Sequence, residues 1–185
     1  MATADVTFEL VDRATAAGHM AELQQLHAEV YGSAPHGRID DPALFADRFR
    51  VQGRQPGFAM AEARHGEYLV GYAAGMPLRP STSWWRNLTT RVPDEVTAEH
   101  PGRTFALVEL LVRASWRRQG IGRSLHDLLL ASRREERATL VVAPTATAAL
   151  IAFQNWGWRK VARTRDNGPG SPVADILVTS LSSSN

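Results

Sequence analysis

One stretch constrains the fold of this chain more than any other: an apolar run, a short loop rich in arginine and glycine, and then an amphipathic run. The first run, residues 105–112, is apolar except for Glu109, the pattern of a strand buried on both faces. The second run begins at Ile121 and repeats leucine at i+4, i+7 and i+8, which predicts a helix with one buried face. The stretch therefore predicts a strand, a tight loop and a helix, with a carboxylate inside the strand.

The loop between the two runs has residues suited to binding an anion. Gly120 and Gly122 let a ligand approach backbone N–H groups at the helix start, where the helix dipole favours negative charge. Flanking guanidinium groups suit a pyrophosphate. They belong to Arg117, Arg118 and Arg123. A strand-to-helix turn with solvated arginines is the alternative. The P-loop pattern is absent, and a dinucleotide-binding loop would need a third glycine at Leu125.

The segment resembles the central motif of the GCN5-related N-acetyltransferase (GNAT) superfamily. In that family the loop has Arg or Gln, two variable residues, Gly, one variable residue, and Gly or Ala, and here these are Arg117, Gly120 and Gly122. The resemblance continues in residues 149–161, A-L-I-A-F-Q-N-W-G-W-R-K-V, which look like the family's run of helix, glycine, aromatic residue and strand. It implies a mixed α/β fold in one domain, residues 1–185, with a central mixed sheet, helices on both faces, and a fourth and fifth strand that diverge.

The resemblance also implies acetyl-CoA as the cofactor and assigns residues to it. The end of the strand would pair its backbone with pantetheine through Leu110, Leu111 and Val112. The loop would hold the pyrophosphate through Arg117, Arg118, Gln119, Gly120, Ile121, Gly122 and Arg123. Phe153 stands where the family usually has the tyrosine that serves as general acid, and Ala146 stands where asparagine is common. Tyr68, Tyr72 and Ser115 are open as substitutes for that acid.

The implied reaction is direct attack of a primary amine on the thioester of acetyl-CoA. An alkyl amine with a pKa of about 10 is mostly protonated at pH 7, so the site must remove a proton. Glu109 is the candidate base, because an apolar strand should raise its pKa toward the working pH. A purely structural carboxylate is the alternative, with Asp40 and Glu99 next in line as the base. A non-catalytic acyl-CoA sensor with the same fold is the competing function.

Periodicity and turn residues predict the remaining elements. Strands are expected over residues 6–11, 58–64, 68–76, 139–142, 158–164 and 173–181, and helices over 20–32, 41–51 and 145–156. Connections are expected over residues 13–18, 33–40 and 165–172, and fraying over 182–185. Gly71 and Gly75 would weaken their strand unless a bend or a close backbone approach is needed there, which leaves room for a groove beside Tyr72.

Residues 80–102 fit no regular period and predict an insertion with helical pieces near 83–88 and 93–100. Its adjacent Trp84 and Trp85 cannot both face one core from a regular helix. They either pack the insertion onto the domain or wall the acceptor site, where indole attracts an ammonium group. Trp84, Trp85 and Tyr72 are therefore the candidate substrate-binding residues.

Composition narrows the class of protein. The chain has 185 residues, 44% of them hydrophobic, which fits one globular domain. It has no cysteine, so disulfides, thiolate metal sites and cysteine nucleophiles are excluded, and no metal site is expected. Without an apolar run of membrane length or a signal sequence, a cytoplasmic protein is expected. The net charge of +2 and the single lysine, Lys160, do not indicate a nucleic-acid surface. The expected partner is a small-molecule or peptide amine, and a homodimer is open.

Overall fold

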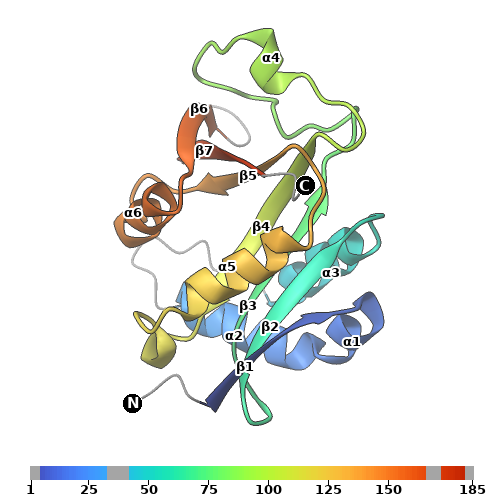
Figure 1. Cartoon of the computed structure of the whole chain (residues 1–185), viewed down its shortest axis with the longest axis vertical. Coiled ribbons are helices and arrows are strands. Elements are labelled where there is room, and N and C mark those ends of the chain that lie inside the picture. Colours follow the sequence, from blue (N-terminus) through green and yellow to red (C-terminus); the bar gives the residue numbers. More distant parts are fainter. Residues whose placement is uncertain (1–4, 33–41, 166–171, 182–185) are drawn as a thin grey trace. The chain divides into compact units, whose positions relative to one another are not determined.

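The structure is a computed structural model, and it describes residues 5–32, 42–165 and 172–181 (Figure 1). The chain forms two compact units, one of Met1–Met76 with Leu107–Arg133 and the other of Pro77–Ala106 with Arg134–Asn185. Strand β4 (Thr104–Val112) has residues in both. The predicted loop over residues 33–40, with Asp40, most of the predicted turn over 165–172, and residues 182–185 lie outside the described residues.

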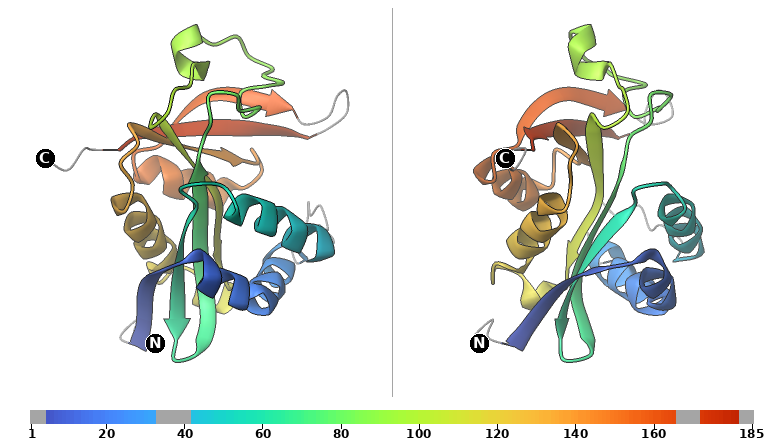
Figure 2. Two further views of the ribbon diagram at one scale, coloured as in Figure 1. Left: turned by 90° about the vertical axis from the view of Figure 1, so that its right-hand side faces the viewer. Right: turned by 45° about the vertical axis from the view of Figure 1, so that its right-hand side comes forward.

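The first unit is a sheet with helices on both faces. Its strands are hydrogen-bonded in the order β1-β2-β3-β4, and both β1 with β2 and β2 with β3 run antiparallel. Helices α1, α2 and α3 lie on one face and α5 on the other (Figure 2). The elements are β1 (Val6–Val11), α1 (Arg13–Gly18), α2 (Met20–Gly32), α3 (Pro42–Gly53), β2 (Ala59–His65), β3 (Tyr68–Pro77), a one-turn 3-10 helix (Ala114–Trp116) and α5 (Ile121–Ala131).

The core of this unit lies between the sheet and helices α2 and α3. Buried side chains from both layers meet there, and the largest fully buried ones are Leu23, Leu26, Phe45, Met60, Leu69 and Tyr72. On the other face, α5 buries Ile121, Leu125 and Leu129, as their spacing predicted. Leu130 is buried as well, whereas the predicted Leu128 is only half-buried. Burial of several such side chains, each contributing about 1.5–3 kcal/mol, stabilises these layers.

Gly71 shows why glycine stands inside β3. A Cβ atom at this position would lie 2.8 Å from the backbone oxygen of Leu111 on β4 and 3.2 Å from a methyl group of Leu125. A side chain would therefore collide with backbone, and the close approach expected from the sequence is confirmed at this residue.

The second unit continues from the beginning of β4. Its strands are hydrogen-bonded in the order β4-β5-β7-β6. β4 and β5 run parallel, whereas β7 is antiparallel to both β5 and β6. The ladder between β4 and β5 covers three pairs and ends at Ala106 and Thr139, and the divergence of the two strands stays a prediction. The elements are α4 (Asp94–Thr97), β5 (Arg137–Val142), α6 (Thr147–Asn155), β6 (Arg159–Arg165) and β7 (Val173–Ser180).

The predicted connection over residues 13–18 is wrong, because these residues form α1. The side chain of Asp12 accepts a hydrogen bond from the backbone N–H of Thr15 at 2.8 Å and caps the helix. Such a cap satisfies one of the N–H groups that a helix start leaves without a partner. The helix has only six residues, which is too short for its apolar spacing to be seen in the sequence.

The predicted helical piece near residues 83–88 is also wrong, because these residues form turns. Asn87 adopts a left-handed conformation with φ of 63°, which a continuing right-handed helix does not tolerate. The chain beyond it bonds to β6 instead, where the N–H of Thr89 donates to the carbonyl of Arg163 at 2.8 Å. Of the second predicted piece, residues 93–100, only α4 is helical.

Candidate functional site

Glu109 lies in the first unit, on the face of β4 that is covered by α2 and α3. Only 7% of its side chain is exposed. One carboxylate oxygen lies 3.4 Å from a guanidinium nitrogen of Arg48 on α3. An ionised carboxylate in such a place needs a positive partner or hydrogen-bond donors, because burying a lone charge is costly. The structure thus confirms that Glu109 is buried and gives it a cationic neighbour.

Arg48 is itself held by aromatic neighbours from the two helices. The same guanidinium nitrogen lies 3.5 Å from the Nε2 atom of His27. The imidazole ring of His27 stacks on the ring of Phe45, with centroids 4.2 Å apart, and the guanidinium carbon lies 5.8 Å from the centroid of that phenyl ring. His27 is itself buried among these rings. Its contacts fix the outer end of the Arg48 side chain beside Glu109.

Tyr72, a candidate for substrate binding, is a fully buried residue of β3. Its hydroxyl has no hydrogen-bond partner among the described residues. Burial raises its pKa well above the usual value, and the negative charge of Glu109 adds to the rise. The hydroxyl is therefore neutral at pH 7, and it is a hydrogen-bond donor within electrostatic reach of Glu109 rather than a base.

The loop before α5 contains two residues in the left-handed backbone conformation. Gly120 is the N-cap residue of α5, with φ of 82°, and no side chain caps the helix there. Arg118 is also left-handed, with φ of 64°. N–H groups of a first helical turn have no acceptor within the helix, and they point along the axis toward whatever lies before it. The start of α5 therefore presents uncapped donors together with the exposed side chains of Arg117 and Arg118.

The loop residues differ in what their side chains contact. Arg117 donates from Nε to the carbonyl of Val112 at 3.0 Å, and Gln119 donates to the carbonyl of Ser115 at 3.2 Å. Ile121 is buried in the core, so only its backbone can face a ligand. The positions of the Arg117 and Gln119 side chains thus depend on backbone carbonyls at the end of β4 and in the turn that follows it.

Arg123 is paired on its own helix. Its Nε atom lies 2.6 Å from a carboxylate oxygen of Asp127, whose other oxygen lies 2.7 Å from His126 Nδ1. Burial acts to raise the pKa of Asp127, but the hydrogen bonds from Arg123 and His126 outweigh it and hold that pKa below its usual value. Burial lowers the pKa of His126. A phosphate group held by Arg123 would compete with this ion pair.

Leu110, Leu111 and Val112 lie on β4 beyond the end of the ladder with β5. Leu111 points into the core with Tyr72, whereas Leu110 and Val112 are half-buried on the opposite face of the strand. Their backbone groups are placed by the strand, and their pairing with pantetheine stays a prediction.

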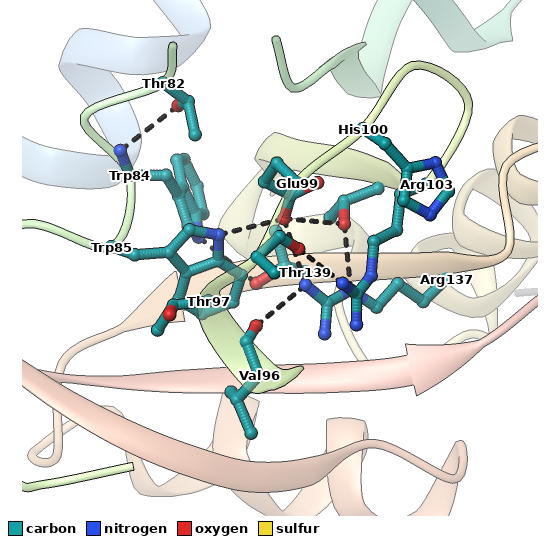
Figure 3. Close-up of polar contacts among 12 residues, drawn as sticks. Thr82, Trp84, Trp85, Val96, Thr97, Glu99, His100, Arg103, Arg137 and Thr139 are labelled. Carbon is teal, nitrogen blue, oxygen red and sulfur yellow. Dashed lines mark hydrogen bonds and ion pairs between the residues drawn. The ribbon is translucent and has the colours of Figure 1, made fainter. Parts of the chain in front are cut away.

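Trp84, Trp85 and Phe153 belong to the second unit. Trp84 donates from its indole N–H to the hydroxyl of Thr139 on β5 at 3.2 Å. Trp85 donates to a carboxylate oxygen of Glu99 at 2.9 Å, and the Arg137 guanidinium carbon lies 5.2 Å from its ring centroid (Figure 3). Both indoles thus hold the insertion onto strands of this unit, which fits the packing interpretation.

Trp85 also lines an open pocket of about 500 Å³. The other lining residues come from the same insertion, namely Pro80, Thr82, Arg86, Leu88, Thr90, Arg91, Val92 and Thr97. A role of Trp85 in binding the acceptor stays a prediction, and so does that of Trp84.

Phe153 is a buried residue of α6. Its ring lies 5.4 Å from the ring of Trp156 and 5.7 Å from that of Trp158, both in edge-on arrangements. Such aromatic contacts contribute about 0.5–1.5 kcal/mol each beyond area burial. The residue at the family's tyrosine position is therefore part of an aromatic cluster.

Arg48 and Arg113 are the residues near the site that sequence reasoning missed. Arg113 is buried, donates to the carbonyl of Leu69 at 2.7 Å, pairs with Glu29 on α2 and covers the ring of Tyr68 at 4.5 Å. It anchors the loop rather than binding an anion. Each contact joins segments far apart in the sequence, so no local pattern signals it.

Metal sites and membrane spans are two further possibilities for the part of the chain that the structure describes. Within it, no cluster of three or more histidine or acidic side chains could hold a metal ion. No helix there is both long enough and apolar enough to cross a membrane.

Comparisons with known proteins bear on this geometry. The sequence model of the acetyltransferase (GNAT) family matches residues 20–158. No curated protein matches the chain. Among solved structures, an acetyltransferase from Thermus thermophilus is 18% identical, with a TM-score of 0.67 over 98% of this chain and 100% of its own.

Two further solved structures have named substrates in their descriptions. The ribosomal-protein-S18-alanine N-acetyltransferase from Escherichia coli is 14% identical, with a TM-score of 0.62 over 97% of this chain and 96% of its own. An aminoglycoside 6'-acetyltransferase type Ii is 15% identical, with a TM-score of 0.68 over 95% of this chain and 97% of its own. At these identities the likeness shows the fold alone, and it confirms the predicted mixed α/β class.

Proposed function

The chain belongs to the acetyltransferase (GNAT) family and is an acetyltransferase, and we propose that it transfers the acetyl group of acetyl-CoA to a primary amine with Glu109 as the base. The observation that carries the proposal is a buried carboxylate on β4, followed in the chain by an uncapped helix start flanked by exposed arginines. The first group can take a proton from an amine, and the second can hold a pyrophosphate.

The donors at the loop fit the anionic part of acetyl-CoA. Backbone N–H groups of Ile121 and Gly122 at the start of α5 would face the pyrophosphate, and Arg117 and Arg118 would add charge. The half-buried strand end at Leu110 and Val112 would hold the pantetheine arm through backbone groups. Acetyl-CoA when bound supplies the acetyl group as a thioester, whose C–S bond breaks as the N–C bond forms, with the electron pair leaving on sulfur.

A residue of this chain then accepts one proton from the amine. A protonated amine has no lone pair for attack, so Glu109 first accepts a proton from it. The nitrogen loses a second proton as the amide forms, and that proton passes through water to the departing thiolate. The guanidinium of Arg48 beside the carboxylate keeps the region near electrical neutrality when Glu109 is ionised. The hydroxyl of Tyr72, whose pKa is raised by burial, is neutral and lies within electrostatic reach of the carboxylate.

No tyrosine of the usual kind protonates the departing thiolate in this proposal. Phe153 offers no proton, and Tyr68 is half exposed beneath the guanidinium of Arg113. The thiol of CoA has an ordinary pKa of about 8.5, so its thiolate is a tolerable leaving group that water can protonate. The proton accepted by Glu109 returns to solvent between turnovers.

Substitution of one glycine tests the binding half of the proposal. Gly122→Asp places a side chain and a negative charge at the start of α5, so acetyl-CoA affinity should fall by about 2 kcal/mol or more. Isothermal titration calorimetry measures it. Gly53→Asp is the matched control, because it adds the same charge at a helix end with open space for a side chain. An unchanged affinity in Gly122→Asp would remove the assignment of the loop.

A sensor that binds acyl-CoA without turnover is the second candidate, and the phenyl ring of Phe153 at the acid position favours it. Release of free thiol from acetyl-CoA separates the two functions. An enzyme produces CoA above the hydrolysis background when an amine from a chemically diverse panel is added. A sensor binds acetyl-CoA in the calorimeter and shows no amine-dependent release.

A further inference from the structure

The charge pair of Glu109 and Arg48 in the first unit has one enclosed and one open end. The carboxylate is 7% exposed, whereas the guanidinium side chain is 39% exposed, and the two groups approach to 3.4 Å. A ligand that enters beside this pair meets the positive charge first and the negative charge behind it. Two opposite charges at that spacing complement a small molecule that carries both an amine and an anion.

We propose that the acetyl acceptor is an amino acid, with its carboxylate bound by Arg48 and its amino group directed to Glu109. The inference rests on the proposed function, since it names the acceptor of the same transfer. In an amino acid the two charged groups are separated by a single carbon atom, which matches the adjacency of the guanidinium and the carboxylate. The transfer forms the N–C bond to that amino group and breaks the C–S bond of the thioester. Of the two protons that the ammonium group loses, one goes to Glu109 and the other passes through water to the departing thiolate.

Other buried carboxylates show that an ion pair in this protein need not be open. Glu62 on β2 is paired with Arg64 at 2.8 Å, and the side chain of Arg64 is only 14% exposed. Glu99 in the second unit is paired with Arg137 at 3.0 Å, and that arginine is 13% exposed. Both arginines are enclosed with their carboxylates and have the features of structural pairs. Asp175 is buried too, and it pairs at 2.9 Å with Arg163, whose side chain is 39% exposed like that of Arg48. Arg48 differs because its partner is the proposed base, so a ligand carboxylate at its exposed side would lie next to the reacting amine.

The surroundings of Arg48 suit a fixed carboxylate receptor. The ring of Phe45 lies against the guanidinium carbon, and His27 Nε2 lies 3.5 Å from the nitrogen that faces Glu109. These contacts limit the rotamers of a long side chain, so less conformational entropy is lost when a ligand binds. A planar guanidinium can also donate two parallel hydrogen bonds to a carboxylate, which a lysine cannot.

The proposal separates amino acids from other amines. A peptide amine or the amine of an aminoglycoside has no carboxylate next to it, so it would leave Arg48 without the anion that we assign to it. The structure therefore predicts selection by the acceptor's carboxylate, whatever its side chain.

The test compares each proteinogenic L-amino acid with its own carboxamide as acceptor for the wild-type protein, by thiol release from acetyl-CoA. The two members of a pair differ in the negative charge, and the amide also has a lower pKa of its amino group, which favours the amide as a nucleophile at neutral pH. We expect kcat/KM for the best amino acid to exceed that for its amide by about tenfold to a hundredfold, the range of a charge-assisted hydrogen bond. Equal rates for acid and amide, or a preference for the amide, would overturn the inference.

Three variants locate the selection at Arg48. In Arg48→Gln the ratio of acid to amide should fall to near one, and in Arg48→Lys it should be intermediate, because one ammonium keeps the charge without the paired donors. Arg50→Gln is the matched control, since Arg50 lies on the same helix and pairs with Asp47 at 2.9 Å. Its ratio should equal that of the wild type. An unchanged ratio in Arg48→Gln would also overturn the inference.

The outcomes distinguish this inference from the function on which it rests. Transfer to simple amines or to peptide amines, with no advantage for amino acids, would leave the acetyltransferase proposal standing and overturn only the acceptor class. Absence of thiol release with every amine, despite acetyl-CoA binding, would overturn both. If Arg48→Gln does not fold, as judged by circular dichroism, the comparison of acid with amide in the wild type still decides.

Discussion

Two buried glutamates, one in each unit, occupy very different surroundings. Glu99 uses one oxygen to accept hydrogen bonds from Trp85 and Thr104 at 2.9 Å and from Arg137 at 3.0 Å, and its side chain is 1% exposed (Figure 3). Glu109 lies 3.4 Å from an arginine that faces solvent, and the hydroxyl of Tyr72, which has no hydrogen-bond partner in the described part of the chain, lies within its electrostatic reach.

The contrast teaches how a buried carboxylate can be assigned a role. Glu99 joins the insertion to β4 and β5, and burial lowers the pKa of the Arg137 guanidinium that it binds. Its three donors are all structural groups. The arginine beside Glu109 keeps a surface open to a ligand, and the strand continues directly into the predicted CoA loop. A buried glutamate therefore has a structural role in the second unit, where it is Glu99, and is the candidate base in the first unit, where it is Glu109.

The largest expected effect is on turnover in Glu109→Gln. A general base contributes about a hundredfold to ten-thousandfold, and glutamine keeps the shape of glutamate but cannot take the proton. We expect kcat to fall by about that factor, while the acetyl-CoA affinity measured by calorimetry barely changes. The wild-type rate should rise with pH through an acidic limb that the variant lacks.

The acidic limb also separates the two possible roles of Glu109. If Glu109 were structural like Glu99, its glutamine variant would melt at a lower temperature and retain the limb. A folded variant with normal cofactor binding and more than about half of the wild-type rate would place the base elsewhere.

The same substitution at Glu99 should act on stability instead. Glu99→Gln leaves the mostly buried Arg137 without its negative partner, which should lower the free energy of unfolding by about 1–3 kcal/mol. In a chain of this size that corresponds to a fall in Tm of several degrees. Differential scanning calorimetry measures the shift, and kcat per folded molecule should stay within about twofold of the wild type. A large loss of kcat without a loss of stability would reverse the roles of the two glutamates.

Much of the fold could be predicted from the sequence, because long elements repeat their pattern several times. The strand Thr104–Val112 begins one residue before the predicted apolar run and ends with it, and the helix Ile121–Ala131 begins at the predicted residue. The misses are short elements set by single contacts, namely the cap at Asp12 and the left-handed turn at Asn87. One side chain at such a point outweighs propensity, and periodicity cannot reveal it.

The site was predictable only where its residues are consecutive. The loop from Arg117 to Gly122 forms a local motif, so its uncapped helix start was expected. Arg48 joins Glu109 across 61 positions of sequence, and no spacing rule links the two. The sequence also could not show that Glu99 pairs with Arg137, because the position of Glu99 depends on the course of an insertion that has no regular period.

The smallest expected effect is that of Phe153→Tyr, which tests whether a hydroxyl on α6 in the second unit can act as a general acid. Phe153 is buried against Trp156 and Trp158, so a hydroxyl adds one polar atom at an aromatic position and should leave the fold intact. If the thiolate leaves without help from the protein, kcat should change by less than about tenfold in the thiol-release assay. The Tm reports any cost of the added hydroxyl separately from the rate. A gain of about a hundredfold would mean that the wild-type site lacks a usable general acid. The wild-type protein would then be an impaired enzyme, with Glu109 as the base in the first unit and no acid on α6.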